Sequence, residues 1–426
     1  MNSKELAGWL AYIEQQHPQA IALGLERVER VRAAMDLVPA VPVITVAGTN
    51  GKGSTCAMLE AVLSAAGYRV GLYTSPHLLR YNERVRIAGR TADDSALAEA
   101  FARVETARKE LAGDTRLTYF EFGTLAAVDL FLRSAVDVLV LEVGMGGRLD
   151  AVNAFDADCA IVTSIGLDHI DYLGSTRDAI GYEKAGIFRA GKPAVLADPA
   201  PPASVLAHAQ AAGARLQCIG REFGYEAGRD RWLFWGPAGR KPGMDYPALA
   251  GPVQLQNASA ALAALDALQQ RLPVSMQDVQ RGLASLELPG RFQVLPGRPV
   301  VVLDVAHNPQ AAEVLAQNLS GMGAFVNTWA VFGMLRDKDI EGVANLLAGQ
   351  VDHWLVCTLP PPRGAAAAQL AQALRQGGAI GVREFENPAL AYAAACSEAD
   401  DNDRIVVFGS FHTVADVLVA RESPKA

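Results

Sequence analysis

The chain has 426 residues, of which 50% are hydrophobic and 20% are charged, and its formal net charge is −8. This composition is typical of a globular protein with two or three domains and excludes a largely disordered chain. The negative charge argues against broad binding to nucleic acid or to an anionic membrane surface.

Cysteine usage and hydropathy indicate a cytoplasmic protein. The five cysteines are odd in number and widely spaced, and no C-x-x-C pair occurs, which is usual for reduced thiols. The first twenty residues carry charges throughout and do not resemble a signal peptide. No run approaches the ~18 apolar residues that a membrane helix needs. We expect a monomer that acts on small molecules.

The first half of the chain predicts an α/β domain. Apolar residues recur at helical spacing in the first forty residues, and short apolar runs then alternate with amphipathic stretches such as 55–68. This rhythm predicts a doubly wound parallel sheet with helices on both faces. The runs expected to form strands are 42–47, 68–75, 136–143, 158–165 and 192–197.

The second half begins with a different pattern and then returns to the first one. Residues 215–250 are rich in Arg, Gly, Pro and aromatics, which favours a short antiparallel meander or an irregular excursion, and a helical stretch follows at 257–272. Proline and glycine pairs in 286–299 are typical of a domain junction. We expect a P-loop-type domain at 1–287 and a smaller Rossmann-like domain at 288–426. Its expected strands are 299–306, 327–334, 352–359, 379–385 and 404–410.

A glycine-rich loop, GTNGKGST at 48–55, follows the first strand and opens a helix. It departs twice from the usual G-x-x-x-x-G-K-[ST] pattern, because Val46 replaces the first glycine and Gly53 separates Lys52 from Ser54. Backbone N–H groups at a helix N-terminus bind phosphate, and glycines allow close approach. A plain strand–helix turn is the alternative, but a lysine within the loop favours a phosphate site.

Polar side chains also follow two further strands. Glu142 ends the apolar run 136–143 and precedes three glycines, while Asp168 and His169 follow the run 158–165. Ligands of parallel sheets bind at the carboxyl ends of the strands, so a magnesium role is reasonable. The alternatives are an edge-strand charge for Glu142 and an ordinary surface or capping histidine for His169.

Two further stretches have weaker signals. Glu183 and Lys184 in GYEKAGIF fit an ordinary solvated helix surface, although a desolvated lysine can add CO₂ to give a carbamate that binds Mg²⁺. In the second domain Asp304 and His307 follow a strand. Asn308 fits a helix N-cap, followed by a proline at the first helical position.

Nine motifs taken in order resemble the Mur ligase superfamily, and within it the folylpolyglutamate synthase branch, most closely its bifunctional bacterial members. The loop variant with Gly53 is similar to the folate branch, and only 47 residues precede Gly48, too few for the UDP-sugar domain of cell-wall Mur ligases. The motifs are GTNGKGS, TSPHL, YFEFGT, LEVGMGGRLDAVN, TSIGLDH, EKAGIF, LPGRF, LDVAHNP and GSFHT.

The resemblance implies an ATP-dependent ligase that forms an acyl phosphate and then an amide with L-glutamate. It implies two Mg²⁺ ions, held by Ser75, Glu142, His169 and a carbamoylated Lys184. ATP would bridge the two domains, with Lys52, Lys184 and His307 in catalysis. The ATP-binding residues so implied are Gly48, Thr49, Asn50, Gly51, Lys52, Gly53, Ser54, Asn257, Arg291 and Asp304.

The resemblance also implies two pterin substrates, dihydropteroate and tetrahydrofolate. The early LGLERV stretch, 23–28, is similar to the dihydropteroate contact of the bifunctional members. The folate-binding residues so implied are Leu25, Arg27, Ser75, Pro76, His77, Phe120, Asp150, Ala151 and Asn153.

Three other functions remain as alternatives. The first is folylpolyglutamate synthase activity alone, or another Mur-type amino-acid ligase. The second is a P-loop NTPase or kinase, which leaves EKAGIF and AHNP without a role. The third is a nucleotide-binding regulatory protein that has lost catalysis, which the presence of Lys184 and His307 disfavours.

Overall fold

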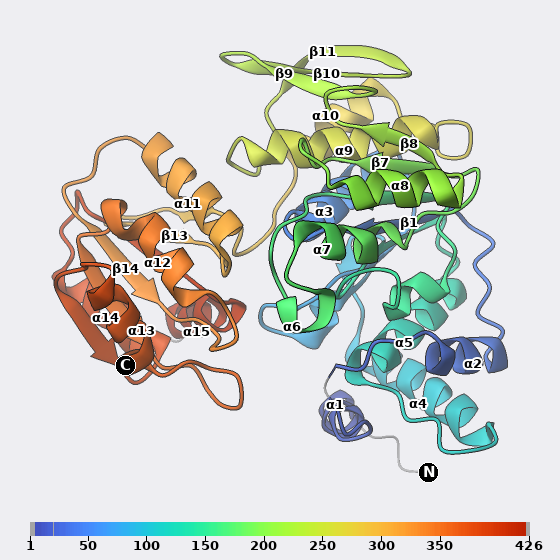
Figure 1. The fold of residues 1–426 in the computed structure, drawn as a ribbon, viewed down its shortest axis with the longest axis horizontal. Coiled ribbons are helices and arrows are strands. Elements are labelled where there is room, and N and C mark those ends of the chain that lie inside the picture. Colours follow the sequence, from blue (N-terminus) through green and yellow to red (C-terminus); the bar gives the residue numbers. More distant parts are fainter. Residues whose placement is uncertain (1–4, 20, 423–426) are drawn as a thin grey trace. The chain divides into compact units, whose positions relative to one another are not determined.

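The computed structural model describes residues 5–19 and 21–422 and divides into two compact units (Figure 1). The first unit comprises 1–248 and 254–286, and the second comprises 249–253 and 287–426. The junction at 286/287 lies one residue from the boundary expected from the sequence. The short segment 249–253 belongs to the second unit, which the sequence pattern did not indicate.

The first unit is built on an eight-stranded sheet whose centre is parallel, as predicted. The strand order is β4-β3-β2-β5-β1-β6-β7-β8, and only β3 and β4 run antiparallel to their neighbours. The five strands expected from apolar runs all form, while β3, β4 and β8 were not foreseen. The strands are β1 (Val43–Ala47), β2 (Val70–Tyr73), β3 (Val85–Ile87), β4 (Arg90–Thr91), β5 (Val138–Glu142), β6 (Cys159–Val162), β7 (Pro193–Leu196) and β8 (Arg215–Cys218).

Both faces of this sheet are covered, because every residue of its central strands is buried. On β1, Val43 and Ala47 pack in the apolar cluster that includes side chains of α5 and α7. Successive strand residues point to opposite faces, so the equally buried Ile44 and Val46 face the other layer, where α3 packs on β1, β2 and β5. The predicted doubly wound arrangement is confirmed.

The helices of the first unit form groups around the sheet. Helices α1, α2, α4 and α5 pack together, α7 packs on α8, and α10 packs on α3 (Figure 1). Among the described residues of the first forty, which were expected to be helical, only Leu6–Glu14 and Glu26–Ala34 form helices. The helices are α1 (Leu6–Glu14), α2 (Glu26–Ala34), α3 (Lys52–Ala65), α4 (Asp94–Glu110), α5 (Tyr119–Arg133), α6 (Ile170–Leu173), α7 (Arg177–Ala185), α8 (Ala203–Ala212), α9 (Val253–Ala267) and α10 (Met276–Ala284).

The predicted meander exists and attaches to the first unit. Strands β9 (Gly224–Ala227), β10 (Arg231–Gly236) and β11 (Gly239–Asp245) pair antiparallel. Lys241 of β11 forms an ion pair with Asp266 of α9 at 2.8 Å, and β11 packs on α10. The meander therefore braces the helix that carries Asn257.

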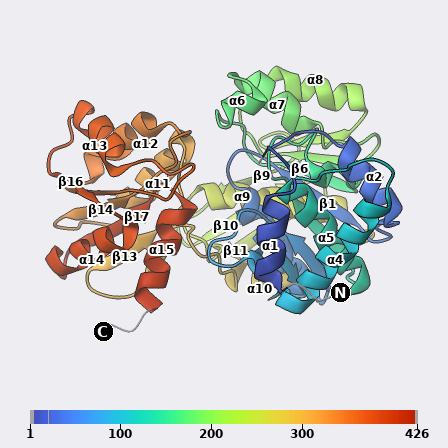
Figure 2. The same cartoon turned by 90° about the horizontal axis from the view of Figure 1, so that it is seen from below.

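The second unit is a three-layered α/β domain. Its sheet has the order β12-β13-β17-β14-β15-β16, with only β12 antiparallel, and helices α11 to α13 lie on one face with α14 and α15 on the other (Figure 2). All five expected strands form. The elements are β12 (Gln293–Leu295), β13 (Val300–Leu303), α11 (Pro309–Gly321), β14 (Thr328–Phe332), α12 (Ile340–Leu347), β15 (His353–Cys357), α13 (Ala367–Gln376), β16 (Val382–Phe385), α14 (Pro388–Glu398), β17 (Arg404–Phe408) and α15 (Phe411–Glu422).

Among the helices in the described ranges, none has the length and apolar character needed to cross a membrane.

Candidate active site

The glycine-rich loop makes a tight approach to its neighbours and then opens α3. Gly51 is the N-cap of α3 in the left-handed conformation, with φ of 84°, and a Cβ there would overlap the Asn257 amide. A Cβ on Gly48 would overlap the Thr163 hydroxyl. Both positions therefore require glycine. The backbone N–H groups of the first turn of α3 point out of the helix, as a phosphate site requires.

Polar contacts with the TSIG turn after β6 fix the shape of the loop. The Thr49 N–H donates to the Ser164 carbonyl at 2.7 Å, and the Asn50 N–H donates to the Ser164 hydroxyl at 3.0 Å. The Thr163 hydroxyl donates to the Asn50 carbonyl at 2.6 Å. The sequence showed the TSIG motif but gave Thr163 and Ser164 no role, since hydroxyl residues at a strand end have no distinctive spacing.

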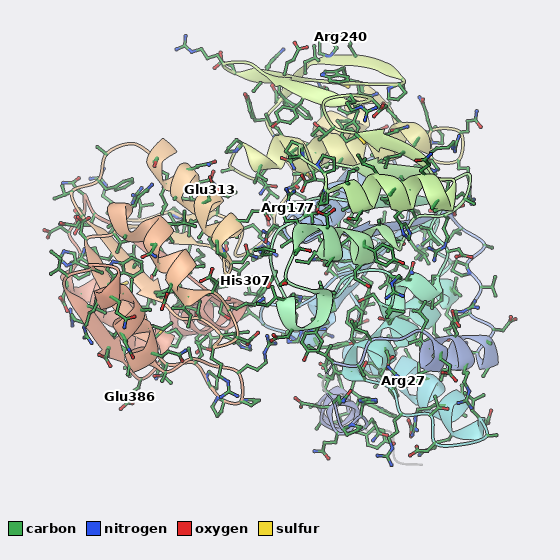
Figure 3. The ribbon with its side chains drawn as sticks, viewed as in Figure 1. Arg27, Arg177, Arg240, His307, Glu313 and Glu386 are labelled. Atoms are coloured by element: carbon green, nitrogen blue, oxygen red, sulfur yellow. The ribbon has the colours of Figure 1, made fainter. Side chains whose placement is uncertain are left out.

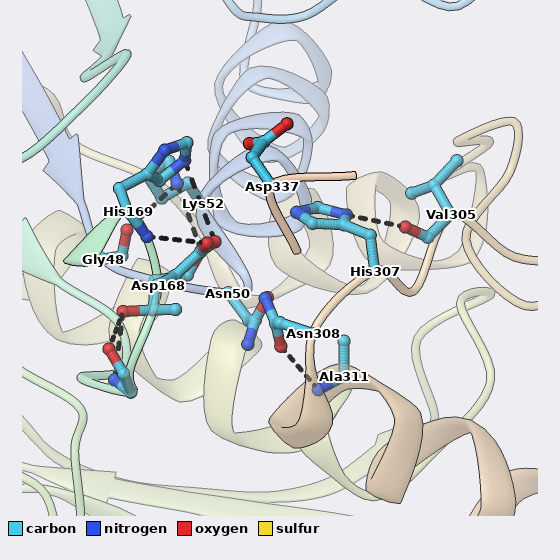
Figure 4. A network of polar contacts seen from close by, with 12 residues as sticks. Gly48, Asn50, Lys52, Asp168, His169, Val305, His307, Asn308, Ala311 and Asp337 are labelled. Atoms are coloured by element: carbon cyan, nitrogen blue, oxygen red, sulfur yellow. Dashed lines mark hydrogen bonds and ion pairs between the residues drawn. The ribbon is translucent and has the colours of Figure 1, made fainter. Parts of the chain in front are cut away.

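Lys52 is the first residue of α3, three residues earlier than the predicted helix start. Its Nζ donates to the carbonyls of Gly48 at 3.0 Å and Thr49 at 3.2 Å, so the side chain folds back over the loop (Figure 4). The ammonium group is thereby held beside the loop N–H groups. A lysine in this position supplies the positive charge that terminal phosphates need.

Glu142 lies at the carboxyl end of β5, which pairs with β2 and β1 and is therefore a central strand. The alternative of a protective edge-strand charge is excluded, because β5 is not at an edge. The buried Glu142 carboxylate accepts the Ser75 N–H at 2.9 Å, so two of the predicted metal ligands lie together.

Several charged groups at this edge of the sheet interact electrostatically with one another, among them Lys52. Asp168, Asp150 and Lys52 all act electrostatically on Lys184, and burial together with the Lys52 charge lowers the pKa of Lys184 to about 7. Burial raises the pKa of Asp150 to about 7, against the opposing effect of Lys52. The structure therefore brings Lys184 of α7 into the neighbourhood of the phosphate loop. A solvated helix surface, the ordinary expectation for Lys184, is wrong, since its side chain is buried.

His169 is the N-cap residue that precedes α6 and has the left-handed conformation, with φ of 51°. Its backbone N–H donates to the Asp168 carboxylate at 2.8 Å, and its Nε2 lies 3.8 Å from the other Asp168 oxygen (Figure 4). Asp168 therefore holds the backbone of His169, and its second oxygen faces the ring. Non-glycine residues in this conformation are uncommon and often mark functional turns.

The donor types at this edge suit Mg²⁺, which prefers oxygen ligands and usually keeps water or phosphate oxygens in its shell. Within residues 5–19 and 21–422, no group of three or more His, Cys, Asp and Glu side chains is arranged to hold a metal. A metal at Glu142 would therefore need the Ser75 hydroxyl, Lys184 or nucleotide phosphates to complete its ligands.

The residues expected to contact the pterin fall in one region of the first unit. Phe120 of α5 packs against Gly144, where a Cβ would lie 2.7 Å from the ring, and its ring centroid is 5.7 Å from that of Tyr73. His77 accepts the Arg84 Nε–H at Nδ1, 2.8 Å away. The exposed Pro76 follows Ser75, whose backbone N–H binds the Glu142 carboxylate.

The early LGLERV stretch meets the loop that follows β5. The Gly24 N–H donates to the Leu149 carbonyl at 3.2 Å, which sets Leu25 near the start of the DAVN turn, residues 150–153. Arg27 projects from α2 and forms an ion pair with the buried Glu121 of α5 at 2.8 Å (Figure 3). The structure therefore brings the predicted dihydropteroate stretch to the same loop as Asp150.

Two side chains of the DAVN turn serve the fold directly. Asp150 accepts the N–H groups of Met145 at 2.9 Å and Val152 at 3.0 Å. Asn153 donates from its amide to the carbonyls of Arg148 and Gly186. Their expected folate contacts stay predictions, and the side chain of Asn153 already has protein partners.

In the second unit, Arg291 and His307 meet at one aromatic ring. The Arg291 guanidinium lies 5.1 Å from the centroid of Phe411, and the His307 ring lies 6.3 Å from the same centroid. His307 Nδ1 lies 2.8 Å from the Val305 carbonyl (Figure 4). Phe411 was part of a recognised motif but received no role from the sequence, because an aromatic residue at a helix start resembles ordinary core.

Asp304 stands at the end of β13 with Arg291 nearby. Its carboxylate accepts the Phe292 N–H at 2.8 Å and the Ala306 N–H at 2.7 Å. Burial raises the pKa of Asp304, and Arg291 opposes this shift. The N-cap role predicted for Asn308 is confirmed, since its side chain accepts the Ala311 N–H at 2.9 Å with Pro309 at the first helical position (Figure 4).

Comparison with known proteins agrees with this picture of two units. Residues 46–225 match the family model of the Mur ligase middle domain, and 290–411 match that of the Mur ligase glutamate ligase domain. The dihydrofolate synthase/folylpolyglutamate synthase of Escherichia coli (strain K12) is 48% identical over 97% of this chain and 94% of its own length. That of Haemophilus influenzae is 40% identical over 96% of each chain.

Solved structures are equally similar. Escherichia coli FolC in complex with DHPP and ADP is 47% identical, with a TM-score of 0.93 over 99% of both chains. A bifunctional folylpolyglutamate synthase/dihydrofolate synthase with Mn, AMPPNP and L-glutamate bound is 45% identical, with a TM-score of 0.91 over 99% of both chains. This chain therefore belongs to the dihydrofolate synthase/folylpolyglutamate synthase family of Mur ligases.

Proposed function

We propose that this ligase uses ATP to join L-glutamate to dihydropteroate, which gives dihydrofolate, and to tetrahydrofolate, which gives folylpolyglutamates. The observation that carries the proposal is the buried Lys184 on α7, near Lys52 of the phosphate loop. A P-loop NTPase or kinase explains Lys52 but gives no role to a second buried lysine. The relatives with DHPP, ADP, AMPPNP, Mn and L-glutamate bound support the same substrates here.

The reaction proceeds in two steps. A carboxylate is a poor electrophile, so its oxygen first accepts the γ-phosphoryl group of ATP, which gives an acyl phosphate and ADP. The amino group of L-glutamate then attacks the acyl carbon, and a tetrahedral intermediate collapses with release of phosphate. The protein contributes positioning and charge neutralisation rather than a covalent intermediate of its own.

In the first unit, the loop N–H groups and Lys52 hold the phosphates, and Asn257 of α9, which packs against Gly51, contacts the nucleotide. Ser75, Glu142, His169 and Lys184 would hold divalent cations. Mg²⁺ bound there would supply positive charge that offsets the negative charge of the triphosphate and the substrate carboxylate. The Lys184 amine, neutral above pH of about 7, attacks CO₂, forms an N–C bond and loses a proton to give a carbamate oxygen donor.

In the second unit, we assign Arg291 to the phosphates, Asp304 to the ribose and His307 to the transferred phosphoryl group. The aromatic contact at Phe411 restricts the Arg291 and His307 side chains, so less side-chain entropy is lost when they engage a ligand. The pterin would lie against Pro76, His77 and Phe120, with Leu25, Arg27 and the DAVN turn alongside.

The test is a product assay by mass spectrometry with purified protein, ATP and Mg²⁺, offering dihydropteroate and tetrahydrofolate separately. We expect a mass increase of one glutamate on dihydropteroate and of one or more on tetrahydrofolate, each strictly dependent on L-glutamate. Extension of tetrahydrofolate alone would restrict the protein to folylpolyglutamate synthase activity. ATP hydrolysis that ignores both pterins and glutamate would instead support the NTPase alternative.

A further inference from the structure

The loop that follows β5 binds the last turn of α7 through several polar contacts. The Arg148 N–H donates to the Glu183 carbonyl at 2.7 Å, and the Arg148 guanidinium reaches the Glu183 carboxylate at 2.8 Å and 3.2 Å. The guanidinium also lies 5.6 Å from the centroid of the Tyr182 ring. One arginine therefore contacts both the backbone and the side chains of the residues that precede Lys184.

Glycines on both sides bring the two segments into direct contact. A Cβ on Gly147 would lie 2.9 Å from the Glu183 carbonyl oxygen and 3.0 Å from that of Lys184. A Cβ on Gly186 would overlap the backbone and side chain of Arg148. The loop and the end of α7 are thus packed backbone to backbone, and neither can shift without moving the other.

Asn153 closes the same contact from the far side of the loop. Its amide nitrogen donates to the carbonyls of Arg148 at 3.0 Å and Gly186 at 3.1 Å. Its amide oxygen accepts from Arg189 Nη2 at 2.8 Å, which fixes the orientation of the amide. We call Arg148, Asn153 and Glu183 the α7 clamp.

The clamp joins the two chain segments that carry Glu142 and Lys184. Glu142 ends β5, two residues before Gly144 begins the loop, and Lys184 lies between the clamped residues Glu183 and Gly186. A helix end needs partners for its last carbonyls, but a single glycine or side chain commonly supplies them. Here the Arg148 backbone N–H binds the Glu183 carbonyl and the Asn153 amide binds the Gly186 carbonyl, so one loop supplies both partners beside a buried lysine.

We propose that Arg148 and Asn153 are positioning residues that hold Lys184 at the distance from Glu142 at which both bind one divalent cation. The inference rests on the metal ligands assigned under the proposed function. Outer partners that orient metal ligands typically change metal affinity by 10- to 100-fold when removed. Loss of the clamp should therefore weaken metal binding even where the fold is retained.

The test measures Mn²⁺ binding to the protein by electron paramagnetic resonance, in bicarbonate buffer without nucleotide, beside the melting temperature. We expect Arg148→Ala and Asn153→Ala to weaken Mn²⁺ binding about tenfold, in the direction of Lys184→Ala. Arg148→Lys keeps the charge and the backbone N–H but loses the two-nitrogen contact with Glu183. Its loss of Mn²⁺ affinity should therefore be smaller than that of Arg148→Ala. Arg148→Lys also covers the case in which Arg148→Ala does not fold.

The matched control is Arg103→Ala. Arg103 of α4 forms an ion pair with the buried Asp129 at 2.6 Å, and its side chain is 28% exposed against 39% for Arg148. This variant should lose stability but keep Mn²⁺ affinity.

The outcomes separate the clamp from the proposed function. Suppose that Lys184→Ala binds Mn²⁺ more weakly, while Arg148→Ala, Arg148→Lys and Asn153→Ala bind it with wild-type affinity. That result would overturn the positioning role of the clamp and leave the proposed metal ligands standing. Unchanged affinity in Lys184→Ala would overturn the metal assignment and the clamp together. The product assay tests the ligase reaction independently of both results.

Discussion

The Glu142 carboxylate accepts the backbone N–H of Ser75 at 2.9 Å, which ties the end of β5 to the turn after β2. Glutamine at position 142 has the same shape and can accept the same hydrogen bond through its amide oxygen. It lacks the negative charge that a divalent cation requires. We therefore expect Glu142→Gln to keep its melting temperature within a few degrees and to weaken Mn²⁺ binding by at least about 100-fold, beyond the loss expected for an outer partner.

Glu60→Gln is the control for Glu142→Gln, because Glu60 is also a buried carboxylate of the first unit and pairs with Arg86 at 3.1 Å. Its replacement should lower stability without changing Mn²⁺ affinity. Equal Mn²⁺ affinity in wild type and Glu142→Gln, measured by electron paramagnetic resonance, would remove Glu142 from the metal site.

Lys184 gives the activity a pH dependence with a definite sign. Its folded-state pKa of about 7 lies below the ordinary value of 10.5, mainly because burial disfavours the charged form. The neutral amine that adds CO₂ therefore accumulates as pH rises through 7. We expect the rate at fixed bicarbonate to rise across this range, and ¹³C-bicarbonate to give a carbamate signal in the NMR spectrum that Lys184→Ala lacks. A short carboxylic acid should partly restore the Lys184→Ala rate.

The same lysine affects stability in the opposite sense to an ion-paired lysine. Between pH 7 and 10.5 the unfolded chain binds more protons at Lys184 than the folded chain does, so the free energy of unfolding rises with pH in this window. Lys184→Met should flatten that rise. Urea titrations at pH 7.5 and 9.5 measure it, and equal slopes in wild type and variant would contradict a buried, largely neutral Lys184.

Gly51 offers a test of the phosphate loop that separates local strain from lost function. Alanine at 51 would sit at φ of 84° and overlap the Asn257 amide. Gly67 also has a positive φ, 92°, but a Cβ there meets nothing within 4 Å. Gly67→Ala should cost about 1 kcal/mol of stability and leave the KM for ATP unchanged. Gly51→Ala should raise the KM for ATP at least about tenfold. Equal KM values in the two variants would exclude Gly51 from nucleotide binding.

The sequence predicts the parallel strands because each is a short apolar run buried on both faces, and the carboxyl-end position of Glu142 follows from that. It does not predict β3, whose three residues VRI are too short an apolar run, or β4, whose two residues Arg90 and Thr91 are polar and exposed. It also misplaces the start of α3, because Lys52 and Gly53 look like loop residues although Lys52 already has helical geometry.

The candidate site could also be predicted only in part from the sequence. Spacing identifies a glycine loop with a lysine, but it gives no reason to place Lys184 near that loop, since EKAGIF alone fits an exposed helix. Burial of Lys184 depends on the packing of α7 against a loop more than thirty residues earlier in the chain, through Gly147 and Gly186. Long-range packing of this kind leaves no local periodicity, so only the family resemblance singled out Lys184 in advance.

His307 is the strongest candidate for a group that acts in the chemical step rather than in binding. Its Nδ1 lies 2.8 Å from the Val305 carbonyl, so Nδ1 carries the proton in the neutral ring and the ring is held in one orientation. A fixed imidazole stabilises a transferring phosphoryl group or assists the incoming amine, effects that typically contribute 10²- to 10⁴-fold. His307→Ala should lower kcat at least about 100-fold while changing the KM for ATP less than threefold.

The control is His353→Ala, since His353 begins β15 and stacks on Trp329 at 4.0 Å. It should lower the melting temperature and leave kcat unchanged. Steady-state kinetics with saturating tetrahydrofolate and L-glutamate measure both, and a His307→Ala enzyme with wild-type kcat would exclude this histidine from the reaction.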